Sequence, residues 1–197
     1  MFTGIVQALG TVVTTTATPS GRRCEFALGA LAGRHFNPGD SIAVNGACLT
    51  VVTLAADRFG ADISAETLRV TTLGSLQPGS PVNLEPALTL SDPLGGHLVT
   101  GHVDGIAEVA ELRREADTAI VRFALPEALR RYAARKGSIC IDGVSLTVND
   151  VADGRVLVTL VPHTLGQTIM QHYEVGTRVN VEVDLVARYV ERLLGTT

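Results

Sequence analysis

The sequence predicts an all-β-dominated fold in which two similar units follow one another, each with short helices, and one further helix ends the chain. Three observations support this prediction. The 197-residue chain repeats itself once, its apolar residues form short segments rich in Val, Thr and Ile, and its 20 glycines and 8 prolines are frequent enough to separate those segments by turns. Short strands joined by tight turns are typical of a small antiparallel barrel or sandwich.

The internal repeat keeps one constant spacing. Thr3-Gly4 recurs as Thr100-Gly101, so equivalent residues are 97 positions apart. Residues 45–51 (Asn-Gly-Ala-Cys-Leu-Thr-Val) recur at the same spacing as residues 142–148 (Asp-Gly-Val-Ser-Leu-Thr-Val). Two further blocks also recur at this spacing: Thr67-Leu68 as Thr164-Leu165, and Gly79, Val82, Asn83 and Glu85 as Gly176, Val179, Asn180 and Glu182. Four blocks with one spacing and no gap indicate a tandem duplication.

The elements of each unit follow from local patterns. Strands are predicted where β-branched residues cluster, at 10–14, 41–44, 49–52 and 81–84 in the first unit and at 119–123, 139–141, 155–160 and 179–183 in the second. Short helices are expected at 65–73, at 126–135, where Pro126 suits a first helical position, and at 164–172. Pro93 and two glycines interrupt the chain between the units. We therefore divide it into residues 1–96, 97–185 and 186–197.

The last of these segments has the pattern of an amphipathic helix. Its apolar residues recur at helical spacing, opposite a face of charged residues: the apolar set is Val186, Tyr189, Val190, Leu193 and Leu194, and the charged set is Arg188, Glu191 and Arg192. Gly195 is a plausible stop. A helix this short needs a packing partner, which is either its own barrel or copies of the helix from other subunits. We expect an oligomerisation helix.

Composition excludes several classes of protein. The net charge of −4 and the sequence pI of about 5.7 provide no basic surface for nucleic acid or an anionic membrane, and aromatic residues are only 4% with no Trp. Three cysteines without a Cys-x-x-Cys spacing argue against a disulfide framework and a structural zinc site. No secretory signal and no apolar run of about 18 residues is visible. A cytoplasmic location is expected.

Several blocks together resemble riboflavin synthase. They are the opening Met-Phe-Thr-Gly-Ile-Val, the two repeated blocks around Cys48 and Ser145, residues 95–105 (Gly-Gly-His-Leu-Val-Thr-Gly-His-Val-Asp-Gly), residues 66–74 and residues 161–165. The resemblance covers essentially the whole chain. It implies two lumazine-binding, six-stranded, antiparallel Greek-key β-barrels and a C-terminal helix, assembled as a homotrimer, with lumazine synthase as a candidate partner. No metal or redox cofactor is implied.

The resemblance also implies a reaction. Two molecules of 6,7-dimethyl-8-ribityllumazine undergo dismutation, in which one donates a four-carbon unit to the other, and the products are riboflavin and 5-amino-6-(ribitylamino)uracil. The duplication suits this reaction, because two identical substrates need two related sites while donor and acceptor need different groups. The two units indeed differ at equivalent positions: Ile5 against His102, Gly39 against Lys136, Asn45 against Asp142, Cys48 against Ser145 and Glu66 against His163.

Three residues are candidates for the chemistry. Cys48 is a lone cysteine in a strand and could simply be a small buried hydrophobe. It is, however, equivalent to Ser145 in the other unit. Both side chains can donate a proton or attack an electrophilic carbon. His102 could be a surface histidine, but histidine is the residue type best suited to carry a proton near neutral pH, and its counterpart Ile5 cannot do so. His97 is expected to orient the second barrel from the linker, and Cys24 and Cys140 to be structural.

The predicted ligand contacts come from the repeated blocks and their neighbours. We expect polar ligand contacts from Thr50, Thr67, Thr147 and Thr164, although β-propensity alone could explain these threonines. Lys136 and Asp142 are further candidates for ligand contacts, although Lys136 also fits a plain exposed turn. The full set of expected substrate-binding residues is Gly4, Ile5, Val6, Cys48, Leu49, Thr50, Asp62, Ile63, Ser64, Ala65, Glu66, Thr67, Gly101, His102, Val103, Lys136, Ser145, Leu146, Thr147, Val161, Pro162, His163, Thr164, Leu165 and Gly166.

Two other functions compete with the enzyme. The same fold also serves as a non-catalytic, fluorescent lumazine- or flavin-binding protein, but such a protein needs only one good site, whereas both repeated blocks are intact here. A flavin-dependent oxidoreductase domain is disfavoured, because no Gly-x-Gly-x-x-Gly phosphate-binding signature follows a strand.

Overall fold

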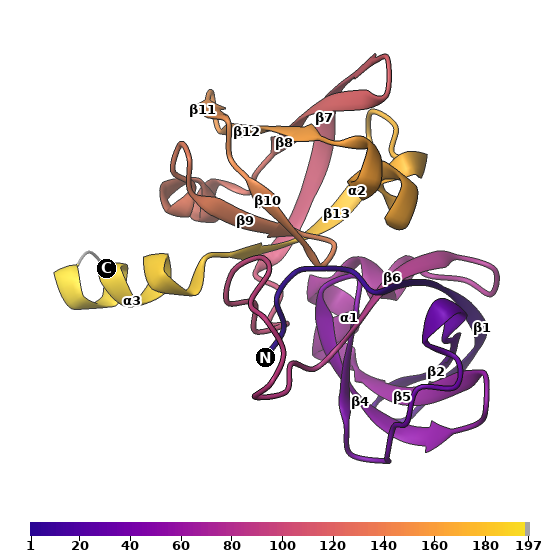
Figure 1. Cartoon of the computed structure of the whole chain (residues 1–197). Helices are drawn as coiled ribbons and strands as arrows, with labels where there is room; N and C mark the ends of the chain where they lie inside the picture. The colour runs from indigo at the N-terminus through magenta and orange to yellow at the C-terminus, as the bar shows by residue number, and fades with distance from the viewer. Residues whose placement is uncertain (196–197) are drawn as a thin grey trace.

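The first unit is a closed antiparallel barrel. This computed structural model describes residues 1–195, so Thr196 and Thr197 of the expected C-terminal segment lie outside the described residues. The strands close in the order β1-β2-β5-β4-β3-β6, in which β2 and β5 are neighbours although they are not consecutive (Figure 1). Their bounds are β1 Ala8–Thr18, β2 Gly21–Ala27, β3 Ser41–Val44, β4 Ala47–Leu54, β5 Arg58–Ser64 and β6 Pro81–Pro86.

The second unit is a curled seven-stranded sheet with the order β10-β9-β13-β7-β8-β12-β11. The bounds are β7 Gly105–Glu115, β8 Thr118–Ala124, β9 Ser138–Ile141, β10 Val144–Thr147, β11 Asp150–Ala152, β12 Arg155–Leu160 and β13 Arg178–Val183. The predicted all-β fold is confirmed. The two units differ in one respect: the strand that is continuous in the first unit, β4, is divided into β10 and β11 in the second. The interruption falls at Val148, whose N–H and C=O pair with Gly137 and Lys136 in the loop before β9.

Each unit has its own apolar core, produced by alternation along the strands. In β12, for example, Val156, Val158 and Leu160 are buried while the intervening residues are not. Phe26 and Phe59 stack inside the first barrel with ring centroids 5.2 Å apart, and Phe123 packs edge-on against Tyr173 inside the second. These cores fix the shape on whose surface the candidate sites are built.

The expected short helices are present, but they are broken differently. The segment expected at 65–73 divides at Thr71 into α1 (Ala65–Val70) and the 3₁₀ helix η2 (Thr72–Ser75), because Thr71 is extended and its hydroxyl accepts the Leu73 N–H. The segment expected at 164–172 divides likewise at Thr168 into α2 (Pro162–Gln167) and η4 (Ile169–His172). The helix expected at 126–135 is the 3₁₀ helix η3 (Glu127–Tyr132), preceded by Pro126, and a further 3₁₀ helix, η1, spans Gly29–Leu31.

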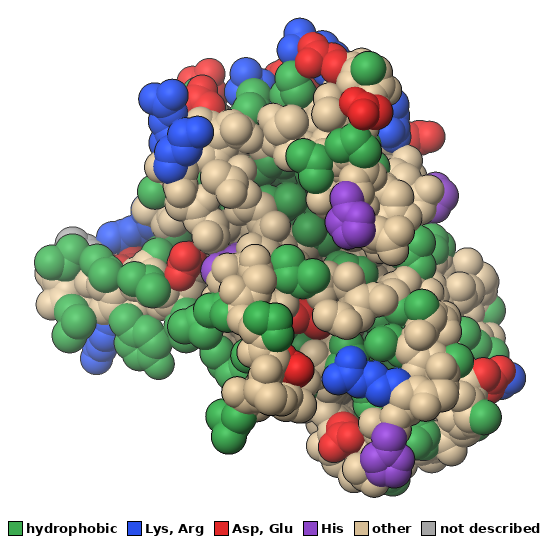
Figure 2. All heavy atoms as spheres, viewed as in Figure 1, with side chains coloured by type: hydrophobic (Ala, Val, Ile, Leu, Met, Phe, Trp, Pro, Cys, Tyr) green, Lys and Arg blue, Asp and Glu red, His purple; other side chains and the backbone are tan. Residues whose placement is uncertain are grey.

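The predicted C-terminal helix is α3 (Leu185–Leu194), which projects from the second unit and ends at Gly195 in the left-handed conformation (Figure 1). Its charged face contacts its own barrel: Arg188 pairs with Asp104, and Glu191 pairs with Arg131 at 2.9 Å and with the Tyr132 hydroxyl. The apolar face points outward, with Tyr189 65% and Leu193 85% exposed (Figure 2). The apolar stripe therefore does not cover the helix's own barrel.

The two units meet at the tips of two equivalent hairpin turns. Asn45-Gly46 joins β3 to β4 and Asp142-Gly143 joins β9 to β10, and all four residues have positive φ, as a tight hairpin turn of this type requires. A Cβ atom on Gly46 would lie only 2.7 Å from the Gly143 nitrogen, and one on Gly143 only 2.8 Å from the Gly46 nitrogen. Only glycine therefore permits this approach.

Two buried asparagines join the units around these turns. The Asn83 amide on β6 donates to the Asp142 carbonyl at 2.8 Å, and its Oδ1 accepts the Ile169 N–H. Asn180 on β13 makes the equivalent contacts with the Asn45 carbonyl, at 2.7 Å, and with the Thr72 N–H. Since every polar atom of these side chains is paired across the interface, the contacts fix the relative position of the two units.

No helix in residues 1–195 is long and apolar enough to span a membrane. All three cysteines are free, and Cys24 and Cys140 are buried in apolar surroundings. Burial raises the pKa of both thiols. A structural role for these two cysteines agrees with this environment.

Asp142 should make the stability of the protein depend on pH. Complete burial raises the pKa of its carboxyl from 3.8 to about 7, although the Tyr173 hydroxyl and the Asn180 N–H both donate to it. The folded state therefore binds this proton more tightly than the unfolded chain. The resulting stabilisation is complete below about pH 4 and is lost as the pH rises through about 7. The parent chain should thus lose stability relative to Asp142→Asn as the pH rises through this range.

The measurement is the free energy of unfolding by urea across that range. Asp150→Asn, an exposed carboxylate on β11, is the control and should follow the parent curve. Parallel curves for Asp142→Asn and the parent chain would show that Asp142 stays ionised in the folded protein.

Candidate functional site

Two equivalent segments run between the barrels and form the centre of the candidate sites. Residues 2–6, which we call the first arm, and residues 99–103, the second arm, touch through an antiparallel bridge. The Phe2 N–H donates to the Val99 carbonyl at 2.7 Å, and the Val99 N–H donates to the Phe2 carbonyl at 3.1 Å. Phe2 and Val99 are buried together with Ala43 and Cys140 of the barrels. The arms are thus ordered parts of the interface.

A buried glutamate holds each arm. Glu85 on β6 accepts the Thr3 N–H at 2.6 Å, the Thr3 hydroxyl at 2.7 Å and the Gly4 N–H at 3.0 Å. Glu182 on β13 holds Thr100 and Gly101 in the same way, at 2.6, 2.7 and 2.9 Å. Burial raises the pKa of the Glu85 carboxyl despite these donors. Each arm is therefore attached to the last strand of its own unit by bonds to a buried carboxylate.

Each arm then reaches the opposite barrel. The Gly4 carbonyl accepts the Ser145 N–H on β10 at 2.7 Å, and the Gly101 carbonyl accepts the Cys48 N–H on β4 at 2.9 Å. Both glycines have positive φ, and a Cβ atom on either would lie 2.6 Å from the Cβ of its partner. Close approach of the two backbones explains why glycine occupies both positions.

The crossing defines two composite sites. At the first candidate site the second arm, with His102, lies against β4 at Cys48, and β5, which pairs with β4, leads into the expected contact residues 62–67. At the second candidate site the first arm, with Ile5, lies against β10 at Ser145, and Val6 of this arm and Leu165 of α2 both pack on the second core. Sequence comparison aligns Ile5 with the first unit and His102 with the second, but the structure places each beside the other unit. A hollow of about 190 Å³ lies between the first arm, at Thr3 and Ile5, and the first unit and linker, and none of residues 145–147 or 161–166 lines it.

Strand alternation separates the predicted contact residues into two groups. Cys48 is half-buried and Thr50 exposed, whereas Leu49 between them is buried, and Ser145, Thr147 and Leu146 repeat this pattern. The thiol and the serine hydroxyl therefore lie on the outer face of each barrel. The side chains of Leu49, Leu146 and Ile63 lie in the cores, so only their backbones are available to a ligand.

The acidic residues of the first site are paired with arginines. Asp62 accepts two hydrogen bonds from Arg23, at 2.7 and 2.6 Å, and Glu66 two from Arg69, at 2.9 and 2.6 Å. These guanidinium groups lower the pKa of both exposed carboxyls, which are ionised at neutral pH and available as acceptors. Next to them, Ser64 caps α1 by accepting the Thr67 N–H at 3.0 Å.

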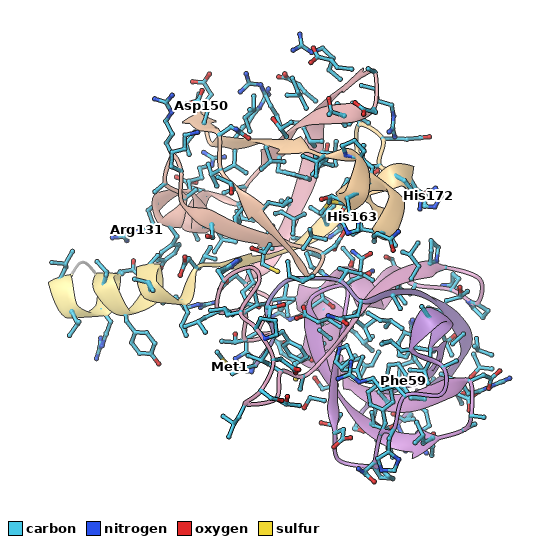
Figure 3. All side chains as sticks on the ribbon, viewed as in Figure 1. Met1, Phe59, Arg131, Asp150, His163 and His172 are labelled. Carbon is cyan, nitrogen blue, oxygen red and sulfur yellow. The ribbon has the colours of Figure 1, made fainter. Side chains whose placement is uncertain are left out.

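The second unit has basic residues at two positions where the first has none. His163 is equivalent to Glu66, and Lys136 is equivalent to Gly39. His163 is exposed at the start of α2, on the side of the second unit that faces the first (Figure 3). Lys136 is exposed and has a φ of +67°, a conformation that its counterpart Gly39 adopts without strain. A non-glycine residue at such an angle costs about 1–2 kcal/mol, so the lysine is held there at the expense of stability. Exposed turn residues elsewhere, Ala116 and Asp153, have the same left-handed conformation, so this angle agrees with a plain turn as well as with a ligand contact.

The two histidines of the linker and second arm have opposite environments. His102 is exposed on the second arm, and its N–H donates to the Thr100 hydroxyl at 3.3 Å. His97 is buried, and its Nδ1 lies 2.7 Å from Oγ of Ser145. No group of three His, Cys, Asp or Glu side chains within residues 1–195 is arranged to hold a metal ion.

Sequence reasoning did not predict the contacts that Glu85 and Glu182 make with the arms, or that of His97 with Ser145. The two glutamates do lie in a repeated block, where an acidic residue in an otherwise apolar strand was a usable signal. The crossing of the arms had no such signal, because it depends on the contact between the two units.

Comparison with known proteins agrees with this architecture. The "Lumazine binding domain" family matches residues 3–87 and again residues 100–184. The solved structure of LumP complexed with 6,7-dimethyl-8-(1'-D-ribityl) lumazine is 28% identical, has a TM-score of 0.83 and covers 93% of this chain and 99% of LumP. LumP complexed with riboflavin has a TM-score of 0.86 over the same shares. The fold and the two family matches thus define a protein with two lumazine-binding domains.

Relatives with higher identity specify the family. The riboflavin synthase of Mycobacterium tuberculosis (strain ATCC 25618 / H37Rv) is 46% identical over 198 residues, which cover 98% of both chains. That of Photobacterium phosphoreum is 43% identical over 194 residues, covering 98% of this chain and 89% of the relative. The chain belongs to the riboflavin synthase family, a family of transferase enzymes.

The crossed arms lead to a prediction about local stability. Glu182→Ala should accelerate hydrogen exchange at the Cys48 amide, on the other barrel, because the second arm loses bonds to a carboxylate. Glu85→Ala should instead accelerate exchange at Ser145. Hydrogen bonds to a charged group contribute about 1.5–3 kcal/mol, so their loss should raise the exchange rate about tenfold or more.

Each variant serves as the control for the other, since both remove the same side chain from equivalent strands. Exchange that accelerates within the variant's own barrel while the opposite amide is unchanged would mean that the arms do not support the opposite sites.

Proposed function

We propose that this chain converts two molecules of 6,7-dimethyl-8-ribityllumazine into riboflavin and 5-amino-6-(ribitylamino)uracil by transfer of a four-carbon unit. The observation that carries the proposal is the presence of two equivalently built sites with different reactive groups, Cys48 in one and Ser145 in the other. Two identical substrates with unequal roles require this combination of similarity and difference. Membership of the riboflavin synthase family supports the same reaction.

The proposed roles follow the composition of the two sites. Cys48, His102 and Ser145 carry the chemistry, and His102 serves the first site because the second arm brings it beside β4. The backbones of the two arms contact the heterocycles, and the exposed hydroxyls of Thr50 and Thr147 contact the ligands from the barrel surface. Asp62 and Glu66 accept hydrogen bonds from ribityl hydroxyls in the first site. The remaining expected contact residues line the two sites around these groups.

The main alternative is a non-catalytic binding protein. LumP, which resembles this chain at 28% identity, is solved with a lumazine, with riboflavin and with flavin mononucleotide. The synthases match at higher identity, and both sites of this chain keep their arm, glutamate and hydroxyl or thiol. A protein that binds a single ligand would not need these groups in both sites.

The deciding experiment uses 6,7-dimethyl-8-ribityllumazine as the sole reactant, without added metal or nucleotide. The enzyme is expected to release one riboflavin for every two lumazines consumed, measured by absorbance. Bound but unconverted ligand would identify a binding protein.

We also propose a homotrimer, a cytoplasmic location and the functional division into residues 1–96, 97–185 and 186–197, with lumazine synthase as a candidate partner. The exposed apolar face of α3 supports assembly through that helix, because an isolated patch of this kind is seldom left uncovered. Three free cysteines agree with a reducing compartment.

Truncation after Asp184 is predicted to lower the oligomeric state while both barrels remain folded. The segment removed contributes little to the barrel cores, and its contacts with its own unit are mainly polar. Sedimentation velocity gives the mass of the assembly, and circular dichroism checks the fold. Tyr189→Glu with Leu193→Glu should have the same effect in the full-length chain, while Arg192→Ala should not. A truncated chain that is still trimeric would show that α3 does not hold the assembly together.

A second prediction concerns where a complete active centre forms. We expect the first site of one subunit to face the second site of the next, so that catalysis requires two chains. Thr50→Trp and Thr147→Trp should block one site each, because both side chains are exposed on equivalent strands. A mixture of the two inactive variants should regain part of the activity after subunit exchange, whereas either variant alone stays inactive. If mass spectrometry verifies exchange and no activity returns, the active centre lies within one chain.

A further inference from the structure

Among the described histidines, His97 is the buried one, although it sits in the segment that links the two units. It is 9% exposed, and its side chain approaches β10 of the second barrel rather than solvent. Its Nδ1 lies 2.7 Å from the hydroxyl oxygen of Ser145, a full hydrogen-bond contact between side chains 48 positions apart in the chain. A linker residue that only joined two domains would not need this contact.

The backbone around His97 is fitted to the same serine. The His97 N–H donates to the Thr3 carbonyl at 3.1 Å, which ties the linker to the first arm. A Cβ atom on the preceding residue, Gly96, would lie 2.1 Å from that carbonyl oxygen and 2.9 Å from the Ser145 hydroxyl. The linker, the first arm and β10 are therefore packed with no room for a further side chain, and this packing holds the imidazole against the hydroxyl.

The protonation of His97 suits a neutral partner. Burial lowers the pKa of its imidazole below the ordinary 6.5, although the carboxylates of Asp184 and Glu182 act in the opposite direction. A neutral ring has one donor and one acceptor nitrogen, so Nδ1 either donates to Ser145 Oγ or accepts its proton. In both cases the contact fixes the position of Oγ, and where Nδ1 accepts the proton it fixes the direction of the O–H bond as well.

The first site lacks this support. Within residues 1–195, the Cys48 thiol has no hydrogen-bond partner, although its backbone is held by the second arm just as that of Ser145 is held by the first. The two reactive groups are thus placed by equivalent backbones, but only the serine is fixed by a second side chain.

We propose that His97 is a positioning residue of the second site, which orients the Ser145 hydroxyl toward the substrate bound there. This proposal rests on the proposed function, since it assigns His97 a role in that reaction. The proposal goes beyond that function by making the two sites unequal in support as well as in chemistry. The second site has a hydroxyl held by a side-chain hydrogen bond, and the first has a thiol without one.

Turnover of 6,7-dimethyl-8-ribityllumazine provides the first test. His97→Leu is expected to lower kcat by about tenfold, the size of one hydrogen bond, with a smaller change in KM. His97→Asn, whose amide can replace Nδ1, should recover more activity than His97→Gln, whose amide lies nearer the position of Nε2. In the double variant with Ser145→Ala, the loss should equal that of Ser145→Ala alone, because His97 acts through the serine. His172→Leu, an exposed histidine on η4, is the control and should be unchanged.

Multiplicative losses in the double variant, or equal activity of the Asn and Gln variants, would overturn the proposal. Thermal unfolding of each variant separates a loss of stability from a loss of positioning.

A second measurement depends neither on turnover nor on a folded His97 variant. The nitrogen resonances of the His97 ring should move in Ser145→Ala and stay in place in Cys48→Ala. Unchanged resonances in Ser145→Ala would overturn the proposal even if the protein is fully active. Conversely, if the parent chain converts no lumazine, the proposed function fails while the resonances still report whether His97 holds the serine.

Discussion

The architecture depends on the contact between two hairpin tips. Gly46 and Gly143 approach until neither position could carry a Cβ atom, and the side chains of Asn83 and Asn180 cross the interface on either side of them. This contact sets the position of one barrel relative to the other. Because β4 and β10 both begin at these turns, it also brings Cys48 and Ser145 within reach of the arms of the opposite units. A tilt of one barrel would break both sites at once.

Buried polar groups carry out most of this positioning. Glu85, Glu182, Asn83 and Asn180 are almost fully buried, and each is satisfied by several donors or acceptors. Removing water from such groups is costly unless every bond is made, which means that a slightly different arrangement is much less stable. The apolar cores make each barrel stable, while these polar contacts decide which of many possible barrel pairs forms.

Much of this could be predicted from the sequence, for reasons that particular residues make clear. The constant spacing between the blocks around Cys48 and Ser145 revealed the duplication. The β-branched segments between glycines located strands in both units, but not β2, β5 or β7. The helical spacing of Val186, Tyr189, Val190 and Leu193 located α3, but not that its charged face would contact the barrel through Arg188 and Glu191. Equally, no local pattern indicates that His102 belongs to the site of the other unit. Both properties depend on the three-dimensional arrangement of segments that are distant in sequence.

The crossed arms have the geometry of a two-fold symmetric dimer: the arm of one unit meets β10 of the other, and the arm of the other meets β4 of the first. In a dimer of identical chains, any substitution would appear in both sites together, so the sites would remain equal. Here a single chain contains both units. A cysteine in one site and a serine supported by a histidine in the other could therefore arise separately, and covalent fusion is what permits a symmetric framework to hold an asymmetric pair of sites.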